Sequence, residues 1–237
     1  MFVHALFQKS SQFLLDFVFP PHCVNCKKVE DWLCQKCLQQ VSIITGTICV
    51  RCGTPISTNL HCLQCENHPL HAVDGIRAAS FFENNPIRSA IHSLKYRNYQ
   101  AAATRLSKLL VEAHQRYKLK ADVIVPVPLH TSRLRERGFN QSELLARAVE
   151  KYLDLPIDGE SLIRVRQTKP QVELRAMDRY ENVLNAFSCR NTRLAGRKIV
   201  LIDDVCTTGS TLDACAVALK KSGAASVWGL TLAKASV

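Results

Sequence analysis

Hydrophobic and polar residues follow two different patterns along this chain, and the change comes near residue 72. Beyond it, short β-branched and apolar runs predict buried strands at residues 76–82, 122–127, 162–165, 198–203 and 226–233. Between them, apolar residues recur at helical spacing over residues 87–94, 101–117, 142–153, 172–187 and 212–222. Strands that alternate with helices predict an α/β domain with a mostly parallel sheet flanked by helices.

Before residue 72 the notable feature is four C-x-x-C pairs. Two thiolates separated by two residues can reach one tetrahedral ion from a tight turn, and a second pair completes a four-cysteine zinc site. Four pairs therefore predict two structural zinc ions. Sequential grouping is favoured because short loops cost less closure entropy. It assigns Cys23, Cys26, Cys34 and Cys37 to one ion and Cys49, Cys52, Cys62 and Cys65 to the other. Interleaved grouping stays open.

Two other uses of the cysteines are weaker. A disulfide framework needs an oxidising compartment and an export signal, and residues 1–22 have neither a basic leader nor a small-residue cleavage site. A redox C-x-x-C normally occurs once, at the start of a helix. Reduced thiols and structural zinc are expected, which indicates a cytoplasmic protein.

Composition places the chain among globular proteins, with 47% hydrophobic and 22% charged residues over 237 positions. The net charge of +11 favours acidic partners such as phosphates, nucleic acid or anionic lipid. Residues 86–120 are strongly cationic, with Glu112 as the single acid. Aromatic side chains interleaved with cations suit single-stranded nucleic acid, although ordinary packing is the more common use of such tyrosines. These tyrosines are Tyr96, Tyr99 and Tyr117.

The strand at residues 198–203 leads into two carboxylates, a small hydroxyl-rich loop and a helix. Loop amides and a helix N-terminus can bind a phosphate, and Gly209 permits close approach or a positive φ. Two carboxylates beside an anion need a sugar diol or a magnesium ion carried by the ligand. The pattern predicts a ribose 5-phosphate site, with the sugar hydroxyls on Asp203 and Asp204 and the phosphate in the loop from Thr207 to Thr211. The alternative is that Ser210 only caps the helix, with Asp213 in a capping box.

The stretch VLIDDVCTTGST at 200–211 resembles the phosphoribosylpyrophosphate (PRPP) motif of type I phosphoribosyltransferases. Three further stretches resemble the ComF/GntX branch of that fold, which carries an N-terminal double zinc ribbon. They are HSLKYRNY at 92–99, VPVPLHTSRLRERGFNQSELLA at 125–146 and TKPQVELRAMDRYENVLNAF at 168–187. The resemblance covers essentially the whole chain. It implies a type I phosphoribosyltransferase-like α/β domain that binds PRPP with Mg²⁺.

The resemblance also implies roles for individual residues. Asp203 and Asp204 would hold the ribose hydroxyls. The 5-phosphate would be held by the residues that follow, Val205, Cys206, Thr207, Thr208, Gly209, Ser210 and Thr211. A pyrophosphate loop is expected at Val127, Pro128, Leu129, His130 and Arg133, with Arg135 and Arg137 close by. A flexible loop that closes over the ligand would include Thr168, Gln171 and Arg175. No catalytic residue is identified.

Three segments are expected: an amphipathic segment at 1–19, a double zinc ribbon at 20–71 and the phosphoribosyltransferase-like domain at 72–237. The first would dock on the body of the protein or lie on the inner membrane. The resemblance implies a role in the uptake or use of single-stranded DNA during competence, with DNA-uptake proteins such as a helicase as partners. The alternatives are an active transferase joining PRPP to a base or amine, and a PRPP-sensing adaptor for DNA or protein.

Overall fold

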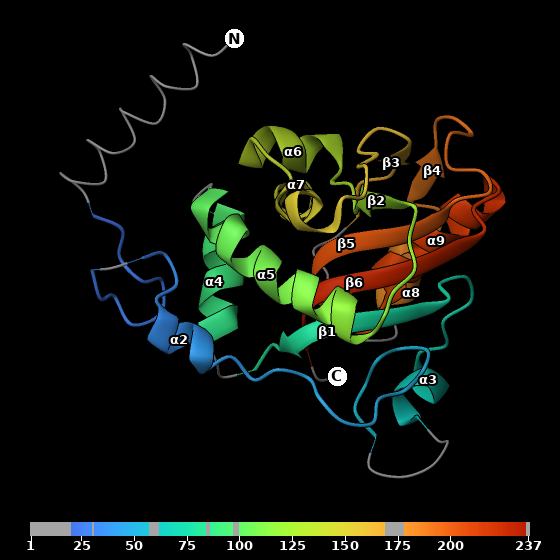
Figure 1. Ribbon diagram of the computed structural model, residues 1–237. Coiled ribbons are helices and arrows are strands. Elements are labelled where there is room, and N and C mark those ends of the chain that lie inside the picture. Colours follow the sequence, from blue (N-terminus) through green and yellow to red (C-terminus); the bar gives the residue numbers. More distant parts are fainter. Residues whose placement is uncertain are drawn as a thin grey trace.

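The protein has a central parallel sheet with helices on both faces (Figure 1). The computed structural model describes residues 20–29, 31–56, 62–83, 86–96, 100–168 and 178–235. Four parallel strands form the sheet in the order β1-β6-β5-β2. Their bounds are Gly75–Phe81 for β1, Val123–Pro126 for β2, Lys198–Cys206 for β5 and Ser226–Lys234 for β6. The predicted α/β fold is confirmed.

Side-chain alternation along the strands produces two buried clusters, one on each face of the sheet. Val200 and Ile202 of β5 pack with residues of α5 (Gln100–Arg116) and α7 (Gln141–Leu153). Ile199 and Leu201 pack on the other face with residues of α9 (Ser210–Lys221). Burial on both faces explains why the strand is apolar at successive positions in the sequence.

The remaining elements surround this sheet. Two short helices belong to the cysteine-rich part, α2 (Gln35–Gln39) and α3 (Leu63–Asn67). Helix α4 (Pro86–Tyr96) precedes α5, and α6 (Thr131–Arg137) precedes α7. Helix α8 (Asp178–Val183) is the next helix along the described part of the chain. Strands β3 (Leu162–Arg164) and β4 (Phe187–Cys189) form a separate antiparallel pair. The predicted strand at 162–165 is therefore formed, but outside the main sheet.

Two sequence predictions of local structure differ from the fold. The helix predicted over 172–187 is wrong at its C-terminal end, because Phe187 begins strand β4 and pairs with Arg164. Helix α6 was not predicted, because its sequence TSRLRER has a single apolar residue and no apolar periodicity. Its ends are set by local signals, His130 at the N-cap and Gly138 at the C-cap with φ +81°.

The cysteine-rich part is joined to the outer edge of β1. Residues 42–44 run antiparallel to this strand: Phe81 N donates to Ser42 O at 2.9 Å and Ile44 N donates to Ala79 O at 3.1 Å. Further along, Ile76 N donates to Arg51 O at 2.7 Å. These bonds satisfy backbone groups that an edge strand would otherwise expose.

The stretch that connects the two parts is held by one carboxylate. Asp213 Oδ1 of α9 accepts hydrogen bonds from the amides of His71, Ala72 and Val73 at 2.9, 2.8 and 3.0 Å. The predicted domain boundary at 71/72 falls here and stays a prediction. No helix in the described part of the chain is long and apolar enough to cross a membrane. The amphipathic segment predicted at 1–19 lies outside the described residues.

Candidate functional site

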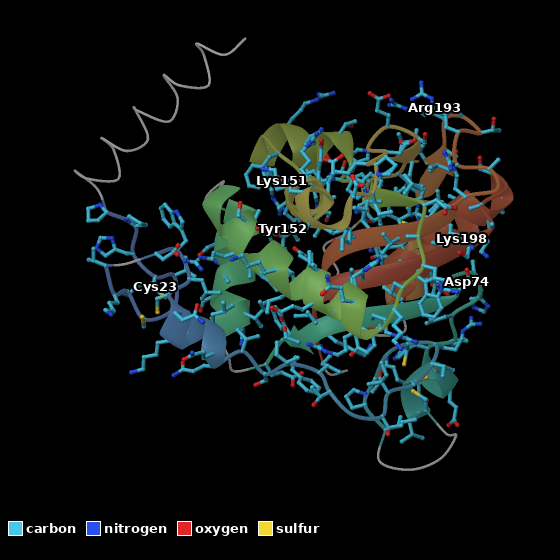
Figure 2. All side chains as sticks on the ribbon, viewed as in Figure 1. Cys23, Asp74, Lys151, Tyr152, Arg193 and Lys198 are labelled. Carbon is cyan, nitrogen blue, oxygen red and sulfur yellow. The ribbon has the colours of Figure 1, made fainter. Side chains whose placement is uncertain are left out.

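The predicted ligand residues lie at the carboxyl edge of the sheet, where loops leave parallel strands. In Figure 2, Asp74 and Lys198 mark the amino ends of β1 and β5 on one side of the molecule. Cys23, close to α2, lies on the opposite side, toward which the strands run. The carboxyl edge is therefore enclosed by α4, α6 and α7 together with the loops after β2 and β5 (Figure 1).

Asp203 is hydrogen-bonded to the first turn of α7. Its Oδ1 accepts from Ser142 Oγ at 2.8 Å and from the Asp204 amide at 2.9 Å. The side chain of Asn140 accepts from Ser142 N at 3.0 Å and donates to Val127 O at 3.0 Å. Asn140 therefore connects the loop after β2 to the first turn of α7, and Ser142 connects that turn to Asp203 of β5.

Asp204 is buried, with 4% of its surface exposed, and forms an ion pair. Lys95 of α4 places its Nζ 2.9 Å from Asp204 Oδ2. That oxygen has no partner with hydrogen-bond geometry. Burial acts to lower the pKa of Lys95, but the Asp204 carboxylate outweighs it and raises this pKa above its ordinary value. Lys95 is therefore a firmly charged ammonium facing a desolvated carboxylate.

The two adjacent carboxylates are electrostatically unequal. Burial, followed by the neighbouring Asp204 carboxylate, raises the pKa of Asp203 to about 7. The Ser142 hydrogen bond, the Asp204 amide and the Lys95 ammonium act in the opposite direction without cancelling this rise. One ammonium beside two carboxylates leaves net negative charge at the site, which is why the Asp204 carboxylate disfavours ionisation of Asp203.

The loop after β5 is shorter than the sequence prediction, because Val205 and Cys206 belong to the strand and Cys206 is buried. The loop itself runs from Thr207 to Gly209, which has φ +90° and is the N-cap of α9. A Cβ at Gly209 would lie 2.7 Å from Ile76 Cδ1 and 3.1 Å from Leu70 Cδ2. Both the backbone angle and the lack of space therefore require glycine.

Polar groups within and beneath this loop fix its shape. Thr208 Oγ1 and Ser210 Oγ are 2.7 Å apart, and Lys234 Nζ donates to Thr207 O at 3.5 Å from a buried position on β6. The capping-box alternative is wrong, since Gly209 and not Ser210 is the N-cap of α9, and Asp213 binds the linker amides instead. The amide of Ser210, the first residue of α9, donates to Thr208 Oγ1 at 3.4 Å.

The predicted pyrophosphate loop lies beside Asp203, because Pro126 is in register with Ile202 on the neighbouring strand. Val127 is buried, and Pro128 and Leu129 are half-buried. His130 caps α6 by accepting from Ser132 N at 3.3 Å through Nδ1, which also lies 2.8 Å from Ser132 Oγ. This ring nitrogen is therefore occupied by a structural role.

Lys95, Arg133 and Arg164 form a cationic rim around the carboxylates, and the two arginines lie on the side of β3. Burial lowers the pKa of Arg164, and Asp203 and Arg133 lie close enough to shift it in opposite directions. The guanidinium is over the Phe187 ring, 5.2 Å from its centroid, and donates to Thr168 Oγ1. Thr168, predicted in the flexible loop, is buried beside this arginine. Gln171 and Arg175 lie outside the described residues.

Three side chains near the carboxylates, Lys95, Ser142 and Arg164, are not predicted as site residues from the sequence. Lys95 lies in the cationic segment and Ser142 at the start of a predicted helix, and neither pattern assigns the residue to the carboxylates. Arg164 interrupts an apolar strand, which is a signal for a buried charge that could have been used. None of the three belongs to the loop that follows β5, so their proximity depends on tertiary packing.

Both four-cysteine clusters have the dimensions of a zinc site. The sulfurs of each set lie within 4.8 Å of one another, and the sets coincide with the sequential grouping. Selected Sγ–Sγ distances are 3.7 Å for Cys26–Cys34, 3.7 Å for Cys49–Cys65 and 3.4 Å for Cys52–Cys62. Four sulfurs at about 2.3 Å from a tetrahedral ion are separated by about 3.8 Å, which matches these distances. Disulfide bonds, at about 2.05 Å, are excluded for these pairs.

Each cluster also contains a cysteine suited to bind as a thiolate. Burial acts to raise the pKa of Cys23 and of Cys49. Hydrogen bonds from nearby backbone amides outweigh it and lower these pKa values to about 6 and about 7, respectively. Thiolates held by the amides of a tight turn are the donors that structural zinc requires.

The cationic segment 86–120 does not form one free surface. Lys95 pairs with Asp204 and Arg105 with Asp31, while Arg116 donates to Ile44 O at 3.2 Å. Tyr117 packs beside Arg77, whose guanidinium carbon is 5.5 Å from the ring centroid, so ordinary packing is its role. Exposed cations remain at Arg88, Lys108, Lys118 and Lys120.

Both the cysteine-rich part and the α/β part of the chain match known protein families. A family model described as double zinc ribbon domain matches residues 14–66, and one described as phosphoribosyl transferase domain matches residues 92–235. Competence protein F of Haemophilus influenzae is 31% identical over 225 residues, which cover 89% of this chain and 96% of that protein. DNA utilization protein YhgH of Escherichia coli K12 is 36% identical over 187 residues, 76% of this chain and 81% of that protein.

Solved structures are more distant. Glutamine PRPP amidotransferase from B. subtilis is 22% identical with a TM-score of 0.39, covering 56% of this chain and 26% of that one. A purine phosphoribosyltransferase from Pyrococcus horikoshii is 22% identical with a TM-score of 0.34, covering 55% of this chain and 70% of that one.

Competence protein ComFC of Bacillus subtilis is 30% identical over 213 residues, 86% of this chain and 85% of that protein. The chain belongs to the competence protein F family, with a double zinc ribbon joined to a phosphoribosyltransferase domain.

Proposed function

We propose that the protein binds PRPP at the carboxyl edge of the sheet. The observation that carries this proposal is the juxtaposition of three features: two carboxylates at the end of β5, a glycine-dependent loop at the N-terminus of α9, and a cationic rim. Carboxylates suit the ribose hydroxyls, the loop suits the 5-phosphate, and the cations suit a pyrophosphate. Asp203 and Asp204 hold the hydroxyls in this proposal, and residues 207–211 hold the phosphate.

The pyrophosphate would lie between the loop at Val127, Pro128, Leu129 and His130 and the guanidinium of Arg133. Arg164 of β3 lies close enough to Asp203 for their charges to interact. Its guanidinium donates to Thr168, at the start of the proposed flexible loop. Closure of that loop, with Gln171 and Arg175, would exclude water from the ligand. Arginine suits this role because its donors bind phosphate oxygens in pairs.

Magnesium fits the same place. Its preferred ligands are carboxylate, phosphate and water oxygens, and Asp204 Oδ2 is a buried carboxylate oxygen that already faces one cation, the Lys95 ammonium at 2.9 Å. Asp203 and Asp204 are the residues that would hold the ion when PRPP carries it. Bound there, magnesium would neutralise the pyrophosphate. Transfer to a base or amine would further require an acceptor, so an active transferase is the second outcome to test.

The cellular role that we propose is the uptake or use of single-stranded DNA, in keeping with the names of the relatives, competence protein and DNA utilization protein. DNA-uptake proteins such as a helicase are the proposed partners. Exposed cations on α5 and in the turn after it, including Lys108, Lys118 and Lys120, offer phosphate contacts. Peripheral attachment to the inner membrane through residues 1–19 stays a prediction.

The experiment is a calorimetric titration of PRPP with magnesium into zinc-loaded protein. Wild type should bind one PRPP per chain, and the double variant Asp203→Asn/Asp204→Asn should not. Asp158→Asn is the matched control, because this carboxylate lies in the turn before β3 and binds Ser161 instead. Equal PRPP affinity in wild type and the double variant would contradict the proposed site.

A second titration follows a fluorescent single-stranded oligonucleotide by anisotropy, with and without PRPP. Saturable DNA binding supports the proposed role, and a change in DNA affinity with PRPP favours the sensing adaptor. Release of pyrophosphate with an added base or amine, absent in the Asp204→Asn variant, favours the transferase. No DNA binding at low salt would contradict the role in DNA handling.

A further inference from the structure

Lys95 occupies the position from which a divalent cation would bind Asp204. Its ammonium is 2.9 Å from Oδ2, and the Asp204 side chain is 6% exposed. A cation that approaches this oxygen from the side of Lys95 is repelled by the ammonium, and binding there requires that the ammonium move away. The displaced ammonium would then be close to the new cation and to Arg137, whose charge already acts on Lys95.

An anionic ligand lowers the free-energy cost of displacing Lys95 from Asp204. Phosphate groups that accompany the cation give the displaced ammonium, and Arg137 with it, a new charge-assisted partner. A free metal ion provides no such compensation, and it adds positive charge to a site that already holds an ammonium. The cost of displacing Lys95 is therefore offset only when metal and phosphate arrive together.

We propose that Lys95 is a specificity-determining residue that excludes free divalent cations and admits the metal only as part of a phosphorylated ligand. This inference rests on the proposed function for the identity of that ligand. The exclusion of free metal depends only on Lys95 and the carboxylates of Asp203 and Asp204, so it is testable without PRPP. Lys95 acts here as a gatekeeper of the carboxylate and not as a catalytic residue.

The test uses Mn²⁺ as a magnesium substitute, with free Mn²⁺ followed by electron paramagnetic resonance in full-length, zinc-loaded protein without PRPP. Zinc bound by thiolates is not displaced, because Mn²⁺ is the weaker competitor for such ligands. Lys95→Met should bind Mn²⁺ at least about tenfold more tightly than wild type, since it removes an adjacent charge from the carboxylates. Lys95→Arg keeps the charge and should behave as wild type.

Lys108→Met is the matched control, because it removes one exposed lysine from α5 with the same change in net charge. Adding Asp204→Asn to Lys95→Met should abolish the gained Mn²⁺ site. Zinc content and thermal midpoint verify that each variant is folded. The inference is wrong if Lys95→Met and Lys108→Met bind Mn²⁺ equally, or if wild type already binds Mn²⁺ as tightly as Lys95→Met.

Failure of this inference and failure of the proposed function are distinguishable. If wild type does not bind PRPP with magnesium but Lys95→Met gains the Mn²⁺ site, the ligand assignment fails and the gatekeeper role holds. If wild type binds PRPP but the Mn²⁺ affinities of wild type and Lys95→Met are equal, the ligand assignment holds and Lys95 has no role in excluding metal.

Discussion

Gly209 is the residue at which the shape of the proposed phosphate loop can be tested most directly. Gly209→Ala puts a Cβ 2.7 Å from Ile76 Cδ1 at a φ of +90°. We expect a stability loss of about 1–3 kcal/mol from backbone strain, and a greater loss in PRPP affinity because the loop must shift. Denaturant unfolding and calorimetry measure the two effects. Gly196→Ala is the control, because its φ is also positive, at +71°, and nothing lies within 4 Å.

The raised pKa of Asp203 gives the unliganded protein a pH dependence of known sign. Because the folded-state pKa is about 7 and the ordinary value is 3.8, this group's stabilising contribution is full below 3.8 and is lost as the pH rises through 7. Asp203→Asn has no ionisable group at this position, so the variant does not lose folding stability in this way as the pH rises. The thermal midpoint of Asp203→Asn minus that of wild type should therefore be more positive at pH 8 than at pH 5. A constant difference would contradict the raised pKa.

At the level of elements, Asp213 connects α9 to the stretch that leads out of the zinc ribbon. Its Oδ1 accepts from three consecutive amides at 2.8–3.0 Å, in a fully buried position. Asp213→Ala leaves those donors without their acceptor, and we expect the free energy of unfolding to fall by about 3 kcal/mol. Asp213→Asn retains an oxygen and should lose less. Urea unfolding measures both, and equal losses would contradict the role of this oxygen.

The four strands of the main sheet were predictable from sequence because each is mostly apolar and buried on both faces, although β1 has Ile76 as its one β-branched residue and also carries Arg77 and Ser80. Helix α6 was not, since it is amphipathic only weakly and its ends depend on His130 and Gly138. The carboxylate pair and its loop were predictable because they are consecutive in the chain. Lys95 could not be assigned to Asp204, because the position of α4 depends on how it packs against α5 and the cysteine-rich part.

At the scale of the whole molecule, two sets of packing contacts connect the zinc ribbon to the proposed ligand site. The first cluster lies under α4: Cys23, Cys34 and Cys37 share a buried core with Ile91 and Leu94, one residue before Lys95. The second lies against β1, where Gly53 has no room for a Cβ because Ile76 O would be 2.4 Å away. Ile76 in turn packs against Gly209. Neither cluster contacts the carboxylates directly.

Loss of either zinc ion should therefore weaken PRPP binding from a distance. Structural zinc supplies much of the folding free energy of small ribbons, so a chain missing one ligand loses local structure there. Cys26→Ser in the first cluster and Cys62→Ser in the second should each release one zinc and lower PRPP affinity by at least about fivefold, a usual size for coupling between sites. Metal analysis and calorimetry measure these effects. Cys189→Ser, outside both clusters, should change neither, and full PRPP affinity in either zinc-deficient variant would show that the ribbon is independent of the site.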